Sequence, residues 1–273
     1  MNVMPKAAKL NAEPASLCSQ PAAGELLLPD GTRQRVTWQV PDEVPVALQY
    51  NSEPYTVMLA TPADLRDFAV GFSLAEAIIA DAADIKGVLV MPVENGVTVD
   101  VAVSEGGLDT TKLVRRAMEG RSGCGLCGIE NIADAIKPLH PVRHQFTPSL
   151  DAILKAAKAL PLAQPMNRFN RTVHAAAWVS SDGQIELVRE DVGRHNALDK
   201  LIGALALAKT GTARGFVMMT SRCSYELVQK AAIAGLPALV TVSAPTALAL
   251  DLAKNAKIFL GALGGGGVVV FNR

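Results

Sequence analysis

Residues 215–260 read GFVMMTSRCSYELVQKAAIAGLPALVTVSAPTALALDLAKNAKIFL, and this stretch decides the fold class. Its apolar runs predict strands at 215–220, 238–242 and 257–260, separated by helices at 225–234 and 246–255. Short apolar strands that alternate with amphipathic helices are typical of right-handed β-α-β units. Strands without polar interruptions, such as residues 238–242, fit a sheet that is buried on both faces. We therefore expect a largely parallel α/β sheet.

The segments before this stretch predict further elements. A hairpin of strands 174–179 and 184–189 turns at Ser181-Asp182-Gly183, and helix 196–209 follows it. Helices are also expected at 129–136 and 150–160, and a strand at 57–60. Strands 88–91 and 97–103 pair around Asn95-Gly96. Thr61 and Pro62 are expected to be the N-cap and the first-turn proline of a helix that runs to Ile79.

The composition and the positions of proline and glycine suggest that the chain has four parts. Residues 1–44 are rich in Pro, Ala and Gly and are expected to form a loosely ordered arm with at most a hairpin around Asp30-Gly31. Residues 45–137 are expected to form a smaller α+β subdomain, residues 138–165 a connector interrupted by prolines, and residues 166–273 an α/β subdomain.

The charge balance excludes some classes of partner. The chain has 273 residues, with 26 basic and 26 acidic side chains, so its formal net charge is zero. Bulk binding to nucleic acid or to an anionic membrane surface needs a basic face, so neither partner is expected. No apolar run approaches a membrane-spanning length, and four cysteines do not make a disulfide framework. A cytoplasmic location with reduced thiols is the expectation; Cys18 and Cys223 are expected to be incidental thiols.

The sharpest local motif is the loop Ser122-Gly123-Cys124-Gly125-Leu126-Cys127-Gly128. Two thiols three residues apart among glycines can exchange disulfides, bind a metal, or carry sulfur as a persulfide. The nearby Arg121 and the start of the following helix favour the thiolate form. Buried, unreactive thiols are the plain alternative.

Cys124 and Cys127 also stand at zinc-finger spacing from His140 and His144. A finger places both histidines on one helix, but Pro138 and Pro141 interrupt this segment. We therefore expect no resident metal at this site.

A second polar cluster covers residues 190–200, which read EDVGRHNALDK between a predicted strand and a predicted helix. Asp191 or Asn196 is expected to cap the helix, and Asp199 and Lys200 to form a solvated face. His195, near the helix start, is a candidate acid, base or anion donor.

Three turns at the carboxyl ends of predicted strands have groups suited to phosphate. In open α/β sheets ligands bind outside these ends. The turns are residues 220–222, residues 243–246, and the stretch from Gly261 through the glycine run 264–267. Hydroxyl groups, one guanidinium and exposed amides suit a ligand that contains a nucleotide.

Together these motifs resemble the formate dehydrogenase accessory sulfurtransferases, the FdhD family. The resemblance is carried by residues 124–128, 190–200 and 242–246, with support from residues 53–54, 61–64, 71–72, 174–176 and 226–231. It covers roughly residues 45–272.

The resemblance implies a sulfurtransferase with a persulfide intermediate. Sulfur would pass from a cysteine desulfurase to the bis(molybdopterin guanine dinucleotide) molybdenum cofactor, which formate dehydrogenase requires. It also implies a cytidine-deaminase-like three-layer core, a smaller α+β N-terminal subdomain, and a homodimer. The implied catalytic residues are Cys124, Cys127 and His195. The implied cofactor-binding residues are Thr220, Ser221, Arg222, Ser243, Thr246, Ala262, Leu263, Gly264, Gly265, Gly266 and Gly267.

Three positions depart from the family pattern: Ser221 stands before the arginine where glycine is usual, Ala77 replaces the glycine of Glu-Gly-Ile-Ile, and the glycine run replaces an aromatic and basic turn. Without the cation of that turn, we expect weaker binding of the ligand. Two alternatives to the sulfurtransferase stay open: a non-catalytic nucleotide-binding module whose CxxC holds metal, and a dithiol oxidoreductase.

Overall fold

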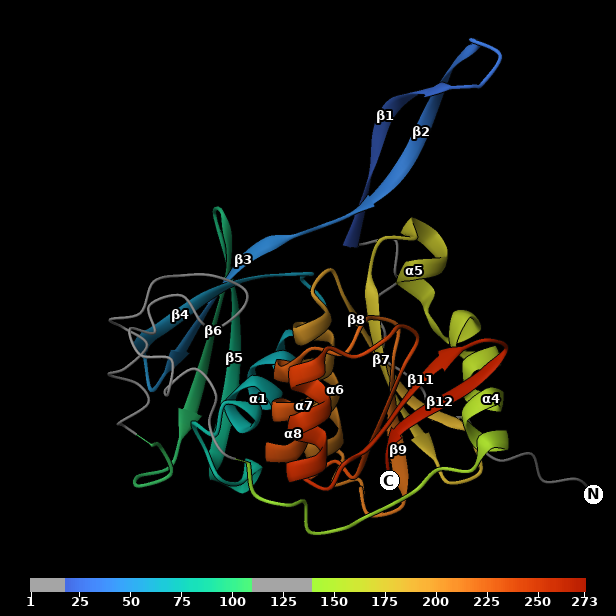
Figure 1. Cartoon of the computed structure of the whole chain (residues 1–273). Helices are drawn as coiled ribbons and strands as arrows, with labels where there is room; N and C mark the ends of the chain where they lie inside the picture. The colour runs from blue at the N-terminus through green and yellow to red at the C-terminus, as the bar shows by residue number, and fades with distance from the viewer. Residues whose placement is uncertain (1–17, 110–138) are drawn as a thin grey trace, which may run out of the picture.

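The computed structural model describes residues 18–109 and 139–273. It is a mixed α/β structure in which helices lie between two sheets (Figure 1). The larger sheet has six strands in the order β12-β11-β10-β9-β7-β8, and the smaller has four in the order β4-β3-β6-β5. A separate two-stranded hairpin, β1-β2, extends away from both.

The strands of the larger sheet are β7 (His174–Ser180), β8 (Ile185–Asp191), β9 (Gly215–Met219), β10 (Ala238–Thr241), β11 (Phe259–Gly264) and β12 (Gly267–Asn272). Only the β9-β10 and β10-β11 pairs are parallel; the β7-β8, β7-β9 and β11-β12 pairs are antiparallel. The expectation of a largely parallel sheet was therefore wrong. Two tight hairpins, β7-β8 and β11-β12, add antiparallel strands to a parallel core of three.

The larger sheet is covered on both faces. Helices α6 (Arg194–Leu207), α7 (Tyr225–Ile233) and α8 (Ala247–Asn255) pack on one face, where Trp178, Val217 and Leu239 point. Helix α4 (Leu150–Ala159) packs on the other, against Val179 and Phe216. Successive strand residues thus enter two different cores, which is why the central strand β9 is apolar throughout. The short elements η3 (Leu160–Ala163) and α5 (Pro165–Asn170) continue the chain after α4.

The smaller sheet contains β3 (Val44–Tyr50), β4 (Glu53–Ala60), β5 (Ile85–Val93) and β6 (Gly96–Val103). Helix α1 (Leu65–Ala75) covers its inner face, where Phe68 and Phe72 pack against Val46, Leu48 and Val99. The short 3-10 helix η2 (Ala82–Asp84) leads into β5. The pairing of β5 with β6 around Asn95-Gly96 confirms the hairpin predicted there.

Helix α1 begins later than predicted. Its N-cap is Asp64, without a side-chain cap, and the helix runs from Leu65 to Ala75. Thr61 makes a tertiary contact instead: its hydroxyl accepts a hydrogen bond from the Val192 N–H at 3.1 Å. The expected N-cap therefore joins the two halves of the molecule.

Helices α1 and α6 cross with their backbones in contact. A Cβ atom on Gly71 would overlap the carbonyl oxygen of Asp199, and one on Gly203 would overlap that of Asp67. Glycine at both positions lets the two helices approach more closely than side chains would permit. This crossing joins the smaller sheet to the larger one.

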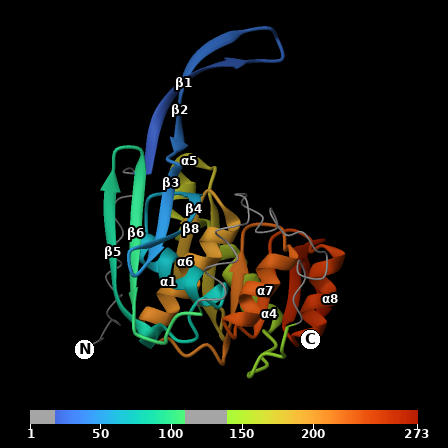
Figure 2. The same cartoon turned by 90° about the vertical axis from the view of Figure 1, so that its left-hand side faces the viewer.

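The hairpin of β1 (Ser19–Leu27) and β2 (Arg33–Pro41) turns at residues 28–32, which confirms the hairpin expected around Asp30-Gly31. Figures 1 and 2 show it projecting from the rest of the molecule. Leu27 and Trp38 on this hairpin are 62% and 55% exposed. Its base approaches α5, where the Ser19 hydroxyl meets the Asn170 amide at 3.1 Å.

Four helices end with the same backbone motif. After α1, α6, α7 and α8 the chain passes through one residue with positive φ, respectively Ala77, Lys209, Gly235 and Lys257. Two backbone hydrogen bonds close each end, as in Ala77 N–H to Leu74 O and Ile78 N–H to Ser73 O. This is the Schellman arrangement, in which glycine is usual at the left-handed position. Within the described residues, no helix combines the length and apolarity needed to cross a membrane.

Candidate functional site

The carboxyl ends of four strands meet at one edge of the larger sheet. Strand β8 is antiparallel to β7 and β7 is antiparallel to β9, so β8 runs in the same direction as β9, β10 and β11. Helices α6, α7 and α8 begin at this edge, directly after β8, β9 and β10. Ligands of α/β sheets bind at such edges, where helix N-termini also gather. We call it the carboxyl edge.

The registers place the three predicted turns next to one another on this edge. Met219 pairs with Thr241, and Thr241 pairs with Ala262, so the residues that follow them leave the sheet side by side. The turns after β9 and β10 stay in contact, because Cys223 and Pro245 form a parallel bridge and the Thr246 N–H donates to Cys223 O at 3.0 Å. Residues 220–222, 243–246 and 262–267 are thus brought together in space.

Several predicted hydroxyl groups already have partners within the protein. Thr220 Oγ1 accepts from the Ala175 N–H at 2.8 Å, and Thr246 Oγ1 caps α8 by accepting from the Ala249 N–H at 3.3 Å. Ser221 is buried and its hydroxyl donates to the Arg222 carbonyl at 2.9 Å. Arg222 and Ser243 are exposed and are the predicted side chains most available to a ligand.

The glycine run has a structural explanation. Gly264 pairs with Gly267, and Gly265 and Gly266 between them have φ of 59° and 79°. Two consecutive positive φ angles match the type I′ turns that favour glycine in two-residue hairpins. The run is therefore the turn of the β11-β12 hairpin at the carboxyl edge. Gly264, Gly265 and Gly266 are exposed, Leu263 and Gly267 half-buried, and Ala262 buried.

His195 lies at the same edge, in the first turn of α6. Its Nε2 is 2.8 Å from Glu226 Oε2 and 3.2 Å from Ser224 Oγ. Ser224 and Glu226 come from the start of α7, so this contact joins the turns that follow β8 and β9. Ser224 of this cluster follows Arg222 by two positions in the chain, so His195 and Glu226 lie beside the turn after β9. Sequence reasoning selected His195 but missed its partners, because they stand about thirty residues away and belong to an ordinary helix start.

His174 is a second histidine at this edge, at the start of β7. Burial lowers the pKa of its imidazole, and the nearby Arg194 guanidinium lowers it further, against the opposing effect of Asp191. Arg194 Nε is buried without a hydrogen-bond partner in the described part of the chain. Three basic side chains, those of His174, Arg194 and His195, therefore lie close together where the sequence predicts an anionic ligand.

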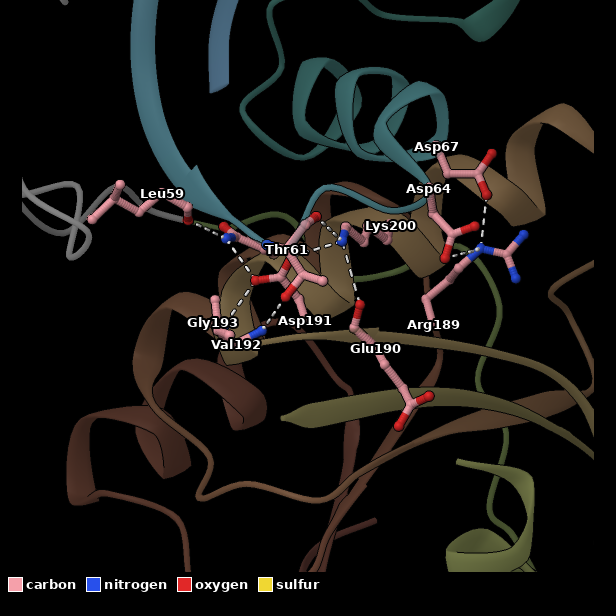
Figure 3. A network of polar contacts seen from close by, with 11 residues as sticks. Leu59, Thr61, Asp64, Asp67, Arg189, Glu190, Asp191, Val192, Gly193 and Lys200 are labelled. Atoms are coloured by element: carbon pink, nitrogen blue, oxygen red, sulfur yellow. Dashed lines mark hydrogen bonds and ion pairs between the residues drawn. The ribbon is translucent and has the colours of Figure 1, made fainter. Parts of the chain in front are cut away.

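Much of the stretch 190–200 is structural. The Lys200 ammonium and the Asp191 carboxylate are fully buried and lie 2.7 Å apart. Lys200 also donates to the carbonyl of Thr61 at 3.0 Å, while Asp191 accepts from the Thr61 N–H at 3.0 Å. Figure 3 shows this network joining the start of α1 to β8 and α6. The expectation that Lys200 forms a solvated face was wrong, because it closes the junction between the two sheets.

Helix α6 also begins differently from the prediction. Its N-cap is Gly193 and no side chain caps it. Asp191 Oδ1 accepts instead from the Gly193 N–H at 2.7 Å and from Asn196 Nδ2 at 3.0 Å. Asn196 in turn donates to the carbonyl of Leu59 at 2.8 Å. Neither Asp191 nor Asn196 therefore serves as the expected cap.

Asp199 was also expected in solvent but is 1% exposed. It pairs with Lys230 of α7 at 2.9 Å, and Lys230 pairs with Glu76 at 2.9 Å. Burial raises the pKa of the Asp199 carboxyl to about 6, although the Lys230 ammonium opposes this shift. Burial alone would lower the pKa of Lys230, but Asp199 and Glu76 together raise it. This second buried network ties α1, α6 and α7 together.

Two further residues have structural contacts: Glu190, the first residue of the stretch, and Arg189, which precedes it. Glu190 accepts from the N–H groups of Met166 and Asn167, both at 2.9 Å, and so satisfies the start of α5. Burial raises the pKa of its carboxyl group. Arg189 donates to Asp67 of α1 at 2.7 Å and lies 3.7 Å from Asp64, as Figure 3 shows.

The predicted sulfur-carrying residues Cys124 and Cys127 lie outside the described residues, as does the helix expected at 129–136. Cys18 and Cys223 are both buried. Burial raises the pKa of the Cys223 thiol to about 12, which keeps it protonated and unreactive at neutral pH. The described ranges contain no group of three or more residues able to hold a metal ion.

A cavity of about 450 Å³ lies away from the carboxyl edge. It is lined by the C-terminal ends of α1, α6 and α7, including Leu74, Leu205 and Ile233. Since α6 and α7 begin at the carboxyl edge, this cavity is at their opposite ends and is not part of the candidate site.

The sequence profile of the FdhD/NarQ family matches residues 41–272. This range includes both sheets, the CxxC segment and the carboxyl edge. The chain belongs to the FdhD/NarQ family. The projecting hairpin of β1 and most of β2 lies before the range shared with this family.

Several FdhD proteins align with this chain over most of the length of both proteins. A Sulfur carrier protein FdhD from Bordetella petrii is 46% identical over 222 residues, covering 81% of this chain and 80% of that protein. The Cupriavidus necator protein of the same name is 47% identical over 238 residues, covering 87% and 80%. The one from Xanthomonas euvesicatoria is 46% identical over 231 residues, covering 84% and 82%.

A crystal structure with a similar fold comes from Desulfotalea psychrophila and is described as that of a formate dehydrogenase accessory protein. It matches with a TM-score of 0.75 and 24% sequence identity, over 94% of this chain and 98% of the other. At this identity the likeness concerns the fold, and it supports the arrangement of two sheets around the helices.

Proposed function

We propose that this chain is a sulfur carrier that takes persulfide sulfur from a cysteine desulfurase. It passes that sulfur to the bis(molybdopterin guanine dinucleotide) molybdenum cofactor required by formate dehydrogenase. The observation that carries the proposal is the 46–47% identity, over about four fifths of both chains, to proteins named Sulfur carrier protein FdhD. The two thiols Cys124 and Cys127 stand inside the range matched by the family.

The sulfur step follows from thiol chemistry. A thiolate of Cys124 attacks the outer sulfur of the persulfide on the desulfurase, the S–S bond of the donor breaks, and the donor cysteine leaves as a thiolate. One S–S bond forms as another breaks, so no external oxidant or reductant is needed. Cys127, three residues along the chain, is the proposed partner that exchanges the outer sulfur with Cys124. Gly123, Gly125 and Gly128 flank the two thiols in the sequence.

The carboxyl edge is the proposed binding site of the guanine dinucleotide. Arg222 and Ser243 are exposed there, as are Gly264, Gly265 and Gly266 of the glycine turn, and Thr246 is the N-cap of α8. Exposed amides at turns and helix starts bind phosphate, and a guanidinium adds charge. We place the cofactor here as substrate, with His195 as the candidate for proton supply or positioning.

The test is mass spectrometry of the full chain after incubation with a cysteine desulfurase and cysteine. We expect a gain of about 32 Da, one sulfur atom, on a peptide that contains Cys124 or Cys127. Single Cys124→Ala and Cys127→Ala variants identify the carrier. If the double variant still activates formate dehydrogenase fully, the proposed function is wrong.

Cys223→Ala is the matched control for this experiment. Its thiol is fully buried and burial raises its pKa to about 12, so it offers no thiolate to a desulfurase. We expect persulfide formation on the Cys223→Ala variant to equal that of the original chain. A sulfur gain that depends on Cys223 would contradict the assignment to the CxxC loop.

Two other functions predict different results, which metal analysis and thiol redox measurements on the purified protein would reveal. Near-stoichiometric zinc with both CxxC thiols blocked would favour a nucleotide-binding module that holds metal. A reversible Cys124–Cys127 disulfide coupled to a reductant, without persulfide, would favour a dithiol oxidoreductase. A cytidine-deaminase-like core, a homodimer and a cytoplasmic location complete the proposal.

A further inference from the structure

The imidazole of His195 is held through one nitrogen only. Nε2 lies 2.8 Å from Glu226 Oε2 and 3.2 Å from Ser224 Oγ, and the Ser224 hydroxyl donates to the same Glu226 oxygen at 3.2 Å. Because the Ser224 hydroxyl donates its hydrogen to Glu226, its oxygen accepts from Nε2, and Nε2 therefore carries the hydrogen. Within the described residues no hydrogen bond to Nδ1 is present, and the side chain is 15% exposed. Nδ1 is therefore the nitrogen left for a ligand.

The same geometry excludes a serine nucleophile. In a Ser-His-acid triad the serine and the carboxylate bind opposite nitrogens, so that the imidazole can take the serine proton. Here both groups meet Nε2, and the serine hydroxyl donates to the carboxylate. Ser224 is therefore not activated by His195, and the cluster serves to hold the ring.

An independent observation supports a positioning role for Ser224. Ser224 is the N-cap of α7, yet its side chain makes no capping hydrogen bond. Ser149 and Thr246, the N-caps of α4 and α8, both accept from a backbone N–H in the usual way. A serine cap typically stabilises a helix. The Ser224 hydroxyl forgoes this bond and is directed to Glu226 and His195.

We propose that His195 meets the bound ligand through Nδ1, and that Glu226 and Ser224 are positioning residues that hold the ring by Nε2. The identity of the ligand rests on the proposed function. Neutral His195 then offers an acceptor at Nδ1, and protonated His195 offers a donor to an anionic oxygen of the dinucleotide. The charged and titratable groups around the ring are Glu226 on α7, Arg194 and Asp199 on α6, and His174 on β7.

Nuclear magnetic resonance of the full chain with nitrogen-15-labelled histidine tests the proposal directly. The sequence has four histidines, and a His195→Gln variant assigns the signal of interest. We expect a hydrogen on Nε2 and, on addition of GDP as the probe, a shift of the Nδ1 resonance. A hydrogen on Nδ1 in the neutral ring, a shift confined to Nε2, or no effect of GDP on either nitrogen would overturn the proposal.

Two variants separate positioning from folding. We expect Glu226→Gln to weaken GDP binding about three- to tenfold and to shift the His195 ring signals, because the ring loses the carboxylate oxygen that lies 2.8 Å from Nε2 and helps to orient it. If the Glu226→Gln variant and the original chain bind GDP with equal affinity, the positioning role of Glu226 is overturned.

Ser224→Ala is compared with Ser149→Ala, which removes a true cap. We expect Ser149→Ala to lower Tm by roughly 2–4 °C without changing the His195 signals. Ser224→Ala should leave Tm nearly unchanged and shift those signals; the reverse result would assign Ser224 to capping. Persulfide formation at Cys124 or Cys127 is scored separately, so the sulfur-carrier function can fail while the Nδ1 contact stands.

Discussion

Lys200 shows how one residue decides the junction between the two sheets. Its ammonium is fully buried, pairs with Asp191 at 2.7 Å and donates to the carbonyls of Thr61 and Glu190. A buried ion pair adds little net stability relative to an apolar pair, but removing one partner leaves a charge without compensation. The pair therefore fixes which segments meet more than it adds to stability.

We expect Lys200→Met to lower the free energy of unfolding by about 3–5 kcal/mol, because the Asp191 carboxylate stays buried without its counter-ion. Urea denaturation followed by circular dichroism measures the change. Lys155→Met is the control, since Lys155 and Asp182 are 48% and 67% exposed and their ion pair is 3.9 Å long. That change should stay within about 1 kcal/mol. Similar losses for both variants would contradict the structural role of Lys200.

Among the secondary-structure elements, helix ends carry identifiable strain. Ala77 and Lys257 occupy the left-handed position after α1 and α8, with φ of 52° and 54°. This conformation costs an L-residue with a Cβ roughly 1–2 kcal/mol, which glycine avoids. Ala77 stands where the FdhD family pattern has glycine. The left-handed backbone conformation at this helix end explains why glycine suits the position.

We expect Ala77→Gly to raise the free energy of unfolding by about 0.5–1 kcal/mol, because relief of the left-handed strain exceeds the added freedom of the unfolded chain. The matched control is Ala234→Gly at the end of α7, where φ is −75°. There glycine relieves no strain and should lower stability by up to about 1 kcal/mol. Thermal or urea unfolding would reveal the opposite signs; two changes of the same sign would contradict the explanation.

The crossing of α1 and α6 depends on its two glycines. We expect Gly71→Ala to lower stability by about 3 kcal/mol or more, because the new Cβ overlaps the backbone of Asp199 and neither helix can move without breaking the buried ion pairs. Gly211→Ala is the control, since a Cβ there meets nothing within 4 Å. Unfolding curves for both variants decide, and a neutral Gly71→Ala would show that the helices do not cross this closely.

At the scale of the whole molecule, buried titratable groups make stability depend on pH. Burial lowers the pKa of His174 from 6.5 in the folded state, so the folded protein favours its neutral form. Its contribution to stability is complete above pH 6.5 and is lost as the pH falls through the folded pKa. Burial of Asp199 acts in the opposite direction, because a raised carboxyl pKa favours the folded state as the pH decreases below about 6.

We expect the original chain to lose more stability than His174→Gln between pH 7.5 and 5.5, with a slope difference of up to about 1.4 kcal/mol per pH unit. The comparison between the two chains cancels the contribution of Asp199. His140→Gln, which changes an exposed side chain, is the control and should follow the original curve. Parallel curves for all three proteins would show that His174 is not desolvated in the folded state.

The sequence by itself determined five of the six strands of the larger sheet, all but β12, and the position of the three turns at its carboxyl edge. Strand and helix periodicity depend on neighbouring residues, so the segments at 215–260, 174–189 and 150–160 were predicted within a few residues. The motifs at 124–128 and 190–200 also led to the right family.

Only the tertiary structure decided which polar residues of 190–200 lie at the carboxyl edge and which are buried between the helices and sheets. Asp199 and Lys200 have the composition of a solvated face, but their partners Lys230 and Asp191 come from segments whose approach no local pattern encodes. The direction of the strands in the mixed sheet, the delayed start of α1 and the cluster of His195, Ser224 and Glu226 have the same cause. Each depends on contacts between residues far apart in the chain, and local propensity contains no information about them.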